Sequence, residues 1–299
     1  MKYLVVYDPD AFVDLLDAIA EESFVGDSES AALDFIEKNA ALLEPWQREI
    51  VRIVRKVAQY FYPQRQTQVM NEGWATFWHY TLLNTMYDRG LLADGFMMEW
   101  LSSHTSVVYQ PPVGHRAYSG INPYALGFAM FTDLRRICEK PTEEDRRWFP
   151  DYAGSDWLTT LDHAMRNFKD ESFVGQFLSP KTMRDFRLFA VRDHAAESEL
   201  EISAIHDDGG YQALRESLSR QYDIGSREPD IQVWNVNLRG DRALTLRHVQ
   251  RNGQPLHEGT HEVLKHVARL WGFDVRLENV DMLGRVTLRD TAPGPKHHF

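Results

Sequence analysis

The spacing of the apolar residues changes near residue 186, and this change constrains the fold more than any other feature of the chain. Before it, apolar residues recur every three to four positions, which predicts amphipathic helices. After it, segments such as residues 231–238 alternate apolar and polar residues, which predicts strands. The expected helices before the change cover residues 28–39, 44–61, 66–89, 95–103, 124–140, 142–147, 155–168 and 171–185.

The second part of the chain predicts a small sheet domain. Its expected strands cover residues 187–193, 199–204, 231–238, 243–249, 274–277 and 285–288, with helices at 210–222 and 260–271. This order of strand pairs and helices is typical of an α+β domain with a mostly antiparallel sheet. We therefore expect an α+β protein with two domains. A mainly helical domain over residues 1–185 would carry the candidate functional site described below, and an α+β domain would cover 186–299.

Composition indicates a cytoplasmic protein. The chain has 299 residues, 43% of them hydrophobic, and its apolar runs are short and interrupted by charge. No run approaches the roughly 20 residues of a membrane-spanning helix, and Asp8 and Asp10 end the first run too early for a signal peptide. The single cysteine, Cys138, suits a reducing compartment and is expected in a helical core.

Several function classes are disfavoured by the same inspection. A formal net charge of −11 argues against nucleic acid as a partner, because nucleic acid is bound through clustered Lys and Arg. The sequence contains neither a glycine-rich phosphate loop nor a Gly-x-Ser-x-Gly elbow. Nucleotide hydrolysis and serine esterase chemistry are therefore not supported.

The main candidate site is a carboxylate and an imidazole on one expected helix. Glu72 and His79 are seven residues apart, which places them on the same helical face. Such a pair can share a metal ion or a water molecule, and it can equally be a buried hydrogen-bonded pair of an aromatic core. Gly73 lacks a side chain, so that a ligand or another backbone can approach there.

A long loop is expected beside this helix. Residues 105–121 are rich in Pro, Gly and Tyr, and loops of this length within a domain are often functional. Asn122 and Pro123 then predict a helix start, with Asn122 as the N-cap and proline at the first helical position.

Two other histidine motifs are interpreted as structural. His257 and His261 match the HExxH pattern of metalloproteases, but we expect the helix to begin at Gly259 or Thr260, which leaves His257 outside it. His206 precedes two acids and a glycine, a pattern that a helix-capping turn explains better than a metal site.

Five sequence blocks closely resemble the SpoVR family, named after stage V sporulation protein R. The blocks are NEGWATFWH at residues 71–79, YSGINPYALG at 118–127, PTEEDR at 141–146, DESF at 170–173 and LRGDR at 238–242. The resemblance extends from about residue 36 to residue 290. It implies a link to spore cortex formation in spore formers, or to stationary-phase and stress responses beside a serine protein kinase.

The resemblance also implies a metal site, and this chain departs from the family pattern at that site. Family members are usually longer and carry an H-x-x-G-H motif ahead of the matched part, whereas residues 1–35 contain no histidine. Together, that motif and the helix of Glu72 and His79 would resemble the metal sites of metallopeptidases. Catalytic zinc usually takes three protein ligands, of which this chain would supply Glu72 and His79. The expected cofactor is thus a divalent metal of the full-length family protein.

These features lead to two hypotheses. In the first, the complete protein is a metal-dependent hydrolase acting on peptidoglycan or its precursors. Glu72 and His79 would be ligands or activate water, while Tyr118, Asn122 and Tyr124 would position substrate. In the second, it is a non-catalytic adaptor of a stress or sporulation programme that binds a kinase or other proteins. In either case we expect the face with Glu72 and His79 to expose a large apolar patch, or to be covered by residues 1–35 or a partner.

Overall fold

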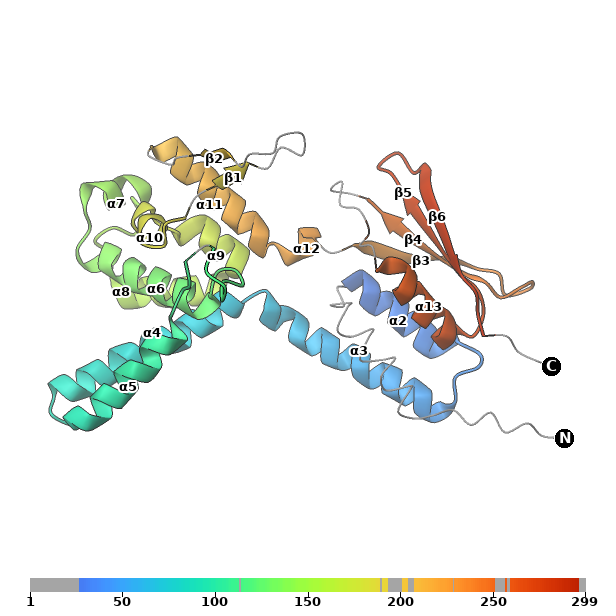
Figure 1. Cartoon of the computed structure of the whole chain (residues 1–299), viewed down its shortest axis with the longest axis horizontal. Helices are drawn as coiled ribbons and strands as arrows, with labels where there is room; N and C mark the ends of the chain where they lie inside the picture. Colours follow the sequence, from blue (N-terminus) through green and yellow to red (C-terminus); the bar gives the residue numbers. More distant parts are fainter. Residues whose placement is uncertain are drawn as a thin grey trace. The chain divides into compact units, whose positions relative to one another are not determined.

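The computed structural model describes residues 27–112, 114–188, 190–192, 201–203, 207–227, 229–250, 256 and 259–295. These residues form an α+β protein, as expected, whose described helices and strands divide between two compact units (Figure 1). One unit comprises Gln66–Asp223, and the other comprises Met1–Arg65 together with Ile224–Phe299. The compact units therefore do not coincide with the expected division after residue 185.

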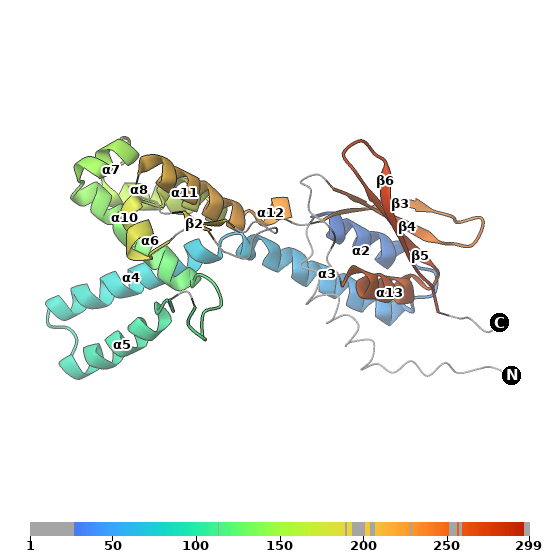
Figure 2. The same ribbon diagram turned by 45° about the horizontal axis from the view of Figure 1, so that its top comes forward.

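The Gln66–Asp223 unit is mainly helical. Phe77, Phe131 and Phe173 are almost fully buried and lie in its core. Its elements are α4 (Gln68–Asp88), α5 (Asp94–Val107), α6 (Pro123–Glu139), α7 (Glu143–Trp148), α8 (Trp157–Asn167), α9 (Asp170–Phe177), α10 (Pro180–Asp185), β1 (Ala190–Arg192), β2 (Glu201–Ser203) and α11 (Asp208–Tyr222). Helices α4 and α5 lie side by side as a helical hairpin (Figure 2).

The other unit is a four-stranded sheet with helices packed against it. The strand order is β3-β4-β5-β6, with a parallel β4–β5 pair between two antiparallel pairs. This sheet confirms the expected mostly antiparallel pairing. Its elements are α2 (Asp27–Asn39), α3 (Pro45–Arg65), α12 (Ile224–Arg227), β3 (Asp230–Val236), β4 (Leu244–Val249), α13 (Thr260–Trp271), β5 (Val275–Val280) and β6 (Val286–Ala292).

The first two described helices pack with the C-terminal sheet. Ile36 of α2 and Val51 of α3 share one apolar core with Leu246 of β4 and Trp271 of α13. Alternate residues of β4 are buried, which is the period expected of a strand with one covered face. The unit is therefore assembled from segments about 200 residues apart in the sequence.

Three expected helix boundaries differ in the structure. Helix α3 continues through Pro63 to Arg65, so the expected stop at residue 61 is wrong. Helix α5 continues to Val107 instead of ending at residue 103. The helix expected over residues 171–185 is two helices, because Ser179 caps α10 and Pro180 occupies its first turn.

Candidate functional site

Helix α4 carries both Glu72 and His79, and a distant carboxylate holds its N-terminus. The Thr67 side chain makes no capping hydrogen bond. Instead, Asp170 accepts hydrogen bonds from the backbone N–H groups of Val69 at 2.8 Å and Met70 at 2.9 Å. Its own backbone N–H donates to the carbonyl of Gln66 at 2.8 Å. Burial raises the pKa of Asp170 to about 6, although the backbone hydrogen bonds oppose this shift. The start of α4 is thus tied to the start of α9.

Replacing Asp170 by alanine should loosen the first turn of α4. The backbone N–H groups of Val69 and Met70 would lose their acceptor in a buried environment, at a cost of about 2 kcal/mol in the free energy of unfolding. Urea unfolding and hydrogen exchange of the two amides measure this. The control is Asp185→Ala, which removes an exposed ion pair with Lys181 and should change stability by less than about 1 kcal/mol. Unchanged protection of both amides in the Asp170 variant would contradict the capping role.

Two glycines allow α4 and α6 to touch through their backbones. A Cβ atom built on Gly73 would lie 2.4 Å from the Cα of Gly127, and one on Gly127 would lie 2.1 Å from the carbonyl oxygen of Val69. The approach expected at Gly73 is therefore made by another backbone. This close crossing brings the second turn of α4 to the start of α6.

Glu72 meets Tyr124 at this crossing. Both side chains are half-buried, and the Tyr124 hydroxyl lies near enough to the Glu72 carboxylate for the two groups to interact. The interaction with Glu72 raises the pKa of Tyr124, followed by smaller effects of burial and of the carboxylate charge. The pair places a carboxylate beside a neutral phenol, an arrangement that can hold and orient a water molecule or a substrate hydroxyl.

Asn122 organises the loop ahead of α6. Its side-chain oxygen accepts from the backbone N–H of Tyr124 at 3.0 Å, which confirms the expected cap. Its side-chain nitrogen donates to the carbonyls of Val107 and Tyr109. Gln110 joins the two ends of the loop, accepting from the backbone N–H of Asn122 and donating to the carbonyl of Gly120. Asn122 therefore connects the end of α5 to the start of α6.

Tyr118 lies on this loop and is 38% exposed. The pKa of Tyr222, which is half-buried, is raised by burial first, and then by the charges of Asp170 and Tyr118. Tyr118, Tyr222 and Asp170 are thus electrostatic neighbours near the start of α4. Sequence reasoning missed Tyr222 and the capping role of Asp170, because both depend on contacts between segments far apart in the chain.

His79 lies in an aromatic group on the α4–α5 hairpin. The Trp100 Nε1–H group donates to Nδ1 of His79 at 3.4 Å, and the two rings are 5.8 Å apart. His104 packs against Trp100 and Phe128 at ring distances of 5.3 and 5.0 Å. Burial lowers the pKa of His104, as does, to a smaller extent, the charge of His79. His104 was not singled out from the sequence, although its four-residue spacing from Trp100 places both on one face of α5.

The structure thus places Glu72 and His79 on one helix but gives them different neighbours. Glu72 contacts Tyr124 of α6, whereas His79 contacts Trp100 of α5.

Comparison with known proteins identifies the family. The model of the family described as SpoVR like protein matches residues 13–227, and that of the SpoVR-like C-terminal domain matches residues 229–282. The chain belongs to the SpoVR family. It is 65% identical over 261 residues to the uncharacterized protein YcgB of Escherichia coli (strain K12), a match that covers 87% of this chain and 51% of that relative. The chain spans about half the length of this relative. No solved structure matches this chain.

In this SpoVR-family chain, the donors near α4 suit a metal by type but not by number. Carboxylate and imidazole are suitable ligands for a divalent transition metal. However, the described residues contain no group of three or more His, Cys, Asp or Glu side chains that could hold an ion. Since catalytic zinc usually takes three protein ligands, the described residues do not complete such a site.

The other motifs have structural surroundings in the described part of the chain. Helix α13 begins at Thr260 after Gly259, as expected, and Nδ1 of His261 lies 2.8 Å from Asp290. His257 and His206 lie outside the described residues, whereas Asp207 caps α11 as expected. Cys138 is a buried residue of α6, also as expected. Among the described helices, none is both long and apolar enough to cross a membrane.

Proposed function

We propose that this SpoVR-family chain supplies part of the active site of a metal-dependent hydrolase that acts on peptidoglycan or its precursors, in sporulation or stress physiology. The observation that carries the proposal is the half-buried Glu72 carboxylate, which lies beside the Tyr124 hydroxyl and is on the same helix as His79. A bound divalent metal would polarise a carbonyl group or lower the pKa of water. Two protein ligands alone do not hold such a metal in place.

The chain's own residues have separate roles in this proposal. Glu72 would remove a proton from water, since its carboxylate is half-buried and lies beside the Tyr124 hydroxyl. Tyr118 would contact substrate from the exposed loop. Asn122 would act through the loop, because both polar atoms of its side chain already bind backbone groups.

Hydrolysis of peptidoglycan fragments tests the proposal. The full 299-residue chain would be incubated with the fragments and zinc, manganese or iron(II), and the products separated by chromatography. We expect metal-dependent cleavage that Glu72→Gln reduces by at least about a hundredfold. The control is Glu99→Gln, which changes an exposed acid of α5. Absence of cleavage with every metal would show that this chain alone is not the hydrolase, and equal loss in both variants would refute the role of Glu72.

Metal content is a separate prediction. Two ligands retain zinc weakly, so the purified chain should carry well below one metal per molecule after dialysis, as measured by inductively coupled plasma analysis. The proposed site would then bind metal only at the concentrations added in the assay. One tightly bound metal per chain, lost in His79→Ala, would overturn the two-ligand description.

A second candidate function is an adaptor that binds a serine protein kinase or other proteins of a stress programme. The exposed apolar side chains of the α4–α5 hairpin favour it, because such surfaces commonly mark interaction sites. Binding of the purified kinase without any hydrolysis, unaffected by Glu72→Gln, would support the adaptor. Hydrolysis lost in that variant would support the enzyme.

A further inference from the structure

Arg215 of α11 is a half-buried arginine without an acidic partner in the described part of the chain. Its Nε–H group donates to the backbone carbonyl of Leu178 at 2.9 Å. Its Nη2 atom is buried and has no hydrogen-bond partner among the described residues. Burial lowers the pKa of Arg215 to about 10, and no neighbouring carboxylate opposes this shift. The side chain is therefore charged at neutral pH, and its charge is not neutralised.

Two aromatic rings hold the guanidinium group in place. The Cζ atom of Arg215 lies 4.5 Å from the centre of the Trp148 ring and 5.4 Å from that of the Phe149 ring. Contacts of this kind attract a cation to the face of a ring. Together with the hydrogen bond to Leu178, they position the guanidinium before any ligand arrives, so that little side-chain freedom is lost on binding.

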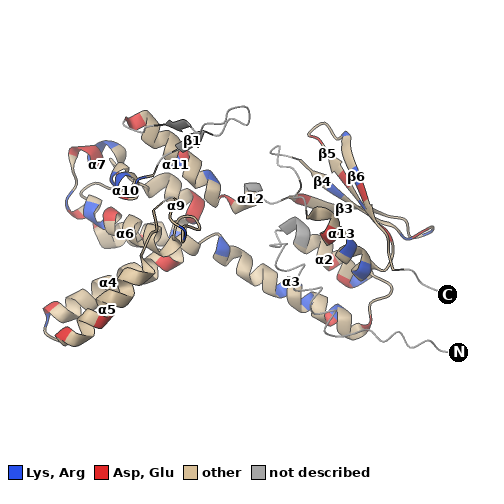
Figure 3. Cartoon of the chain, in the orientation of Figure 1, with Lys and Arg blue, Asp and Glu red and all other residues tan. Residues whose placement is uncertain are grey.

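The other arginines of α7 and α10 beside this group are already paired. Figure 3 shows acidic and basic residues side by side on α7. Arg184 donates to the two carboxylate oxygens of Glu144 at 3.0 and 2.6 Å. Arg147 lies 3.9 Å from the carboxylate of Asp208. Of these three arginines, only Arg215 has no carboxylate partner among the described residues.

One uncompensated positive charge matches a ligand with one negative charge. A carboxylate carries a single charge and forms strong hydrogen bonds with a guanidinium. A phosphate group carries up to about two, and the second charge would face the carboxylates of Glu144 and Asp208 with no free cation to balance it. Nη1 is the nitrogen left for the ligand, because Nε of Arg215 is bonded to Leu178 and Nη2 is buried.

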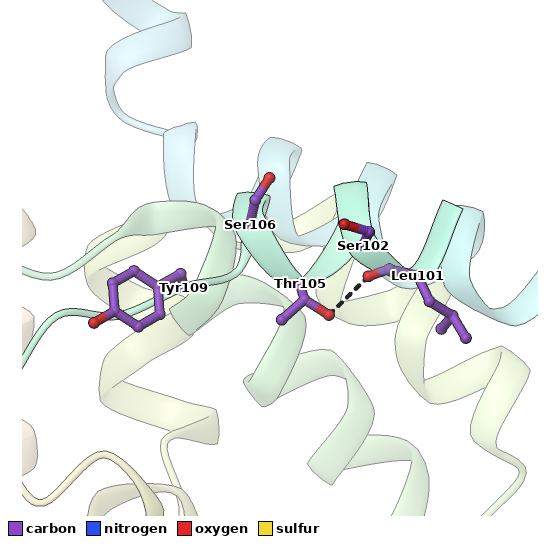
Figure 4. Close-up of a pocket in the computed structure, with 5 residues that line it drawn as sticks. All are labelled: Leu101, Ser102, Thr105, Ser106 and Tyr109. Carbon is purple, nitrogen blue, oxygen red and sulfur yellow. Dashed lines mark hydrogen bonds between the residues drawn. The ribbon is translucent and has the colours of Figure 1, made fainter. Parts of the chain in front are cut away.

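The open hollow on α5 is a poorer site for an anion. The Thr105 hydroxyl in it already donates to the backbone carbonyl of Leu101 at 2.7 Å (Figure 4). The residues that line it include no charged side chain: Leu101, Ser102, Thr105, Ser106 and Tyr109. The unpaired guanidinium of Arg215 therefore has the stronger attraction for an anionic ligand.

We propose that Arg215, whose guanidinium lies over the Trp148 ring, binds the carboxylate group of a ligand. The carboxylate belongs either to a small organic acid or to the C-terminus of a short peptide. Binding neutralises a charge that the described residues leave unpaired. This inference does not depend on the proposed hydrolase activity.

Nuclear magnetic resonance of the full chain tests the site. Sodium acetate would replace sodium chloride at constant ionic strength, and the resonances of the Arg215 Nε–H and Trp148 Nε1–H groups would be followed. We expect both to shift with a dissociation constant of about 1–10 mM, and phosphate to bind at least about tenfold more weakly. N-acetyl-Gly-Gly distinguishes the two sources: binding at least about tenfold tighter than acetate identifies a peptide C-terminus, and equal or weaker binding identifies a small acid.

Two variants complete the test, with the Trp148 Nε1–H resonance as the measurement. Arg215→Gln should weaken acetate binding at least about tenfold, because the amide is uncharged. The matched control is Arg220→Gln, since Arg220 is an exposed arginine of α11 whose Nε also donates to a backbone carbonyl, that of Glu216. It should leave the dissociation constant unchanged. The wild-type titration decides the question even where Arg215→Gln does not fold. The proposal would be overturned by unshifted resonances up to about 50 mM acetate, by equal weakening in both variants, or by tighter binding of phosphate than of acetate.

Discussion

Alanine at Gly73 should lower the free energy of unfolding by at least about 3 kcal/mol. The new methyl group would lie 2.4 Å from the Gly127 backbone, and no rotation of a side chain can relieve a clash between two helix backbones. Helices α4 and α6 would have to separate, which would also part Glu72 from Tyr124. Gly127→Ala should be as severe, since its methyl group would lie 2.1 Å from the carbonyl oxygen of Val69.

Gly95→Ala is the matched control for both substitutions. Gly95 lies in the first turn of α5, and nothing stands within 4 Å of a Cβ atom built on it. Alanine there should be neutral or stabilise the protein by up to about 1 kcal/mol. Urea unfolding of the three variants measures the differences. A Gly73→Ala protein as stable as Gly95→Ala would show that the two helices do not cross through these glycines.

Asparagine at Asp145 should cost roughly 3 kcal/mol at neutral pH. The buried Asp145 carboxylate accepts two hydrogen bonds from the Arg136 guanidinium, at 2.7 and 2.8 Å. It also accepts from the backbone N–H and hydroxyl of Thr142 in the capping box of α7. An amide would present a donor to groups that are themselves donors, and Arg136 would lose one of its two carboxylate partners while keeping its bond to Asp133.

The effect of this substitution should depend on pH in a defined direction. Burial alone would raise the pKa of Asp145, but the hydrogen bonds from Arg136 and Thr142 outweigh burial and lower it from 3.8 to about 2. Because the folded pKa is depressed, the stabilisation is present above about pH 4 and is lost as the pH falls through 2. It amounts to roughly 2 kcal/mol.

Unfolding of wild type and Asp145→Asn at several pH values tests this prediction. The difference in stability between them should shrink as the pH falls from 4 towards 2. The control is Asp162→Asn, which alters an exposed ion pair with Arg166 and should cost less than about 1 kcal/mol at every pH. A difference that stays constant between pH 4 and 2 would show that Asp145 is not held in its charged form.

Much of the local structure followed from short-range patterns in the sequence. Apolar spacing predicted α4 with both Glu72 and His79, and the Asn122-Pro123 pair predicted the start of α6. The five sequence blocks predicted the SpoVR family, which the family models show. These predictions succeeded because helix spacing and capping depend on residues within about one turn of each other.

The tertiary structure decided what those elements meet. Asp170 caps a helix 100 residues earlier, Gly73 meets the backbone of Gly127, and α2 and α3 pack with the C-terminal sheet. His104 packs against Trp100 and lies near His79 because α5 folds back beside α4. Spacing along the chain reveals which face of a helix is apolar, but not which distant segment covers it. That choice depends on the packing of whole elements, and so only the folded protein shows the neighbours of Glu72 and His79.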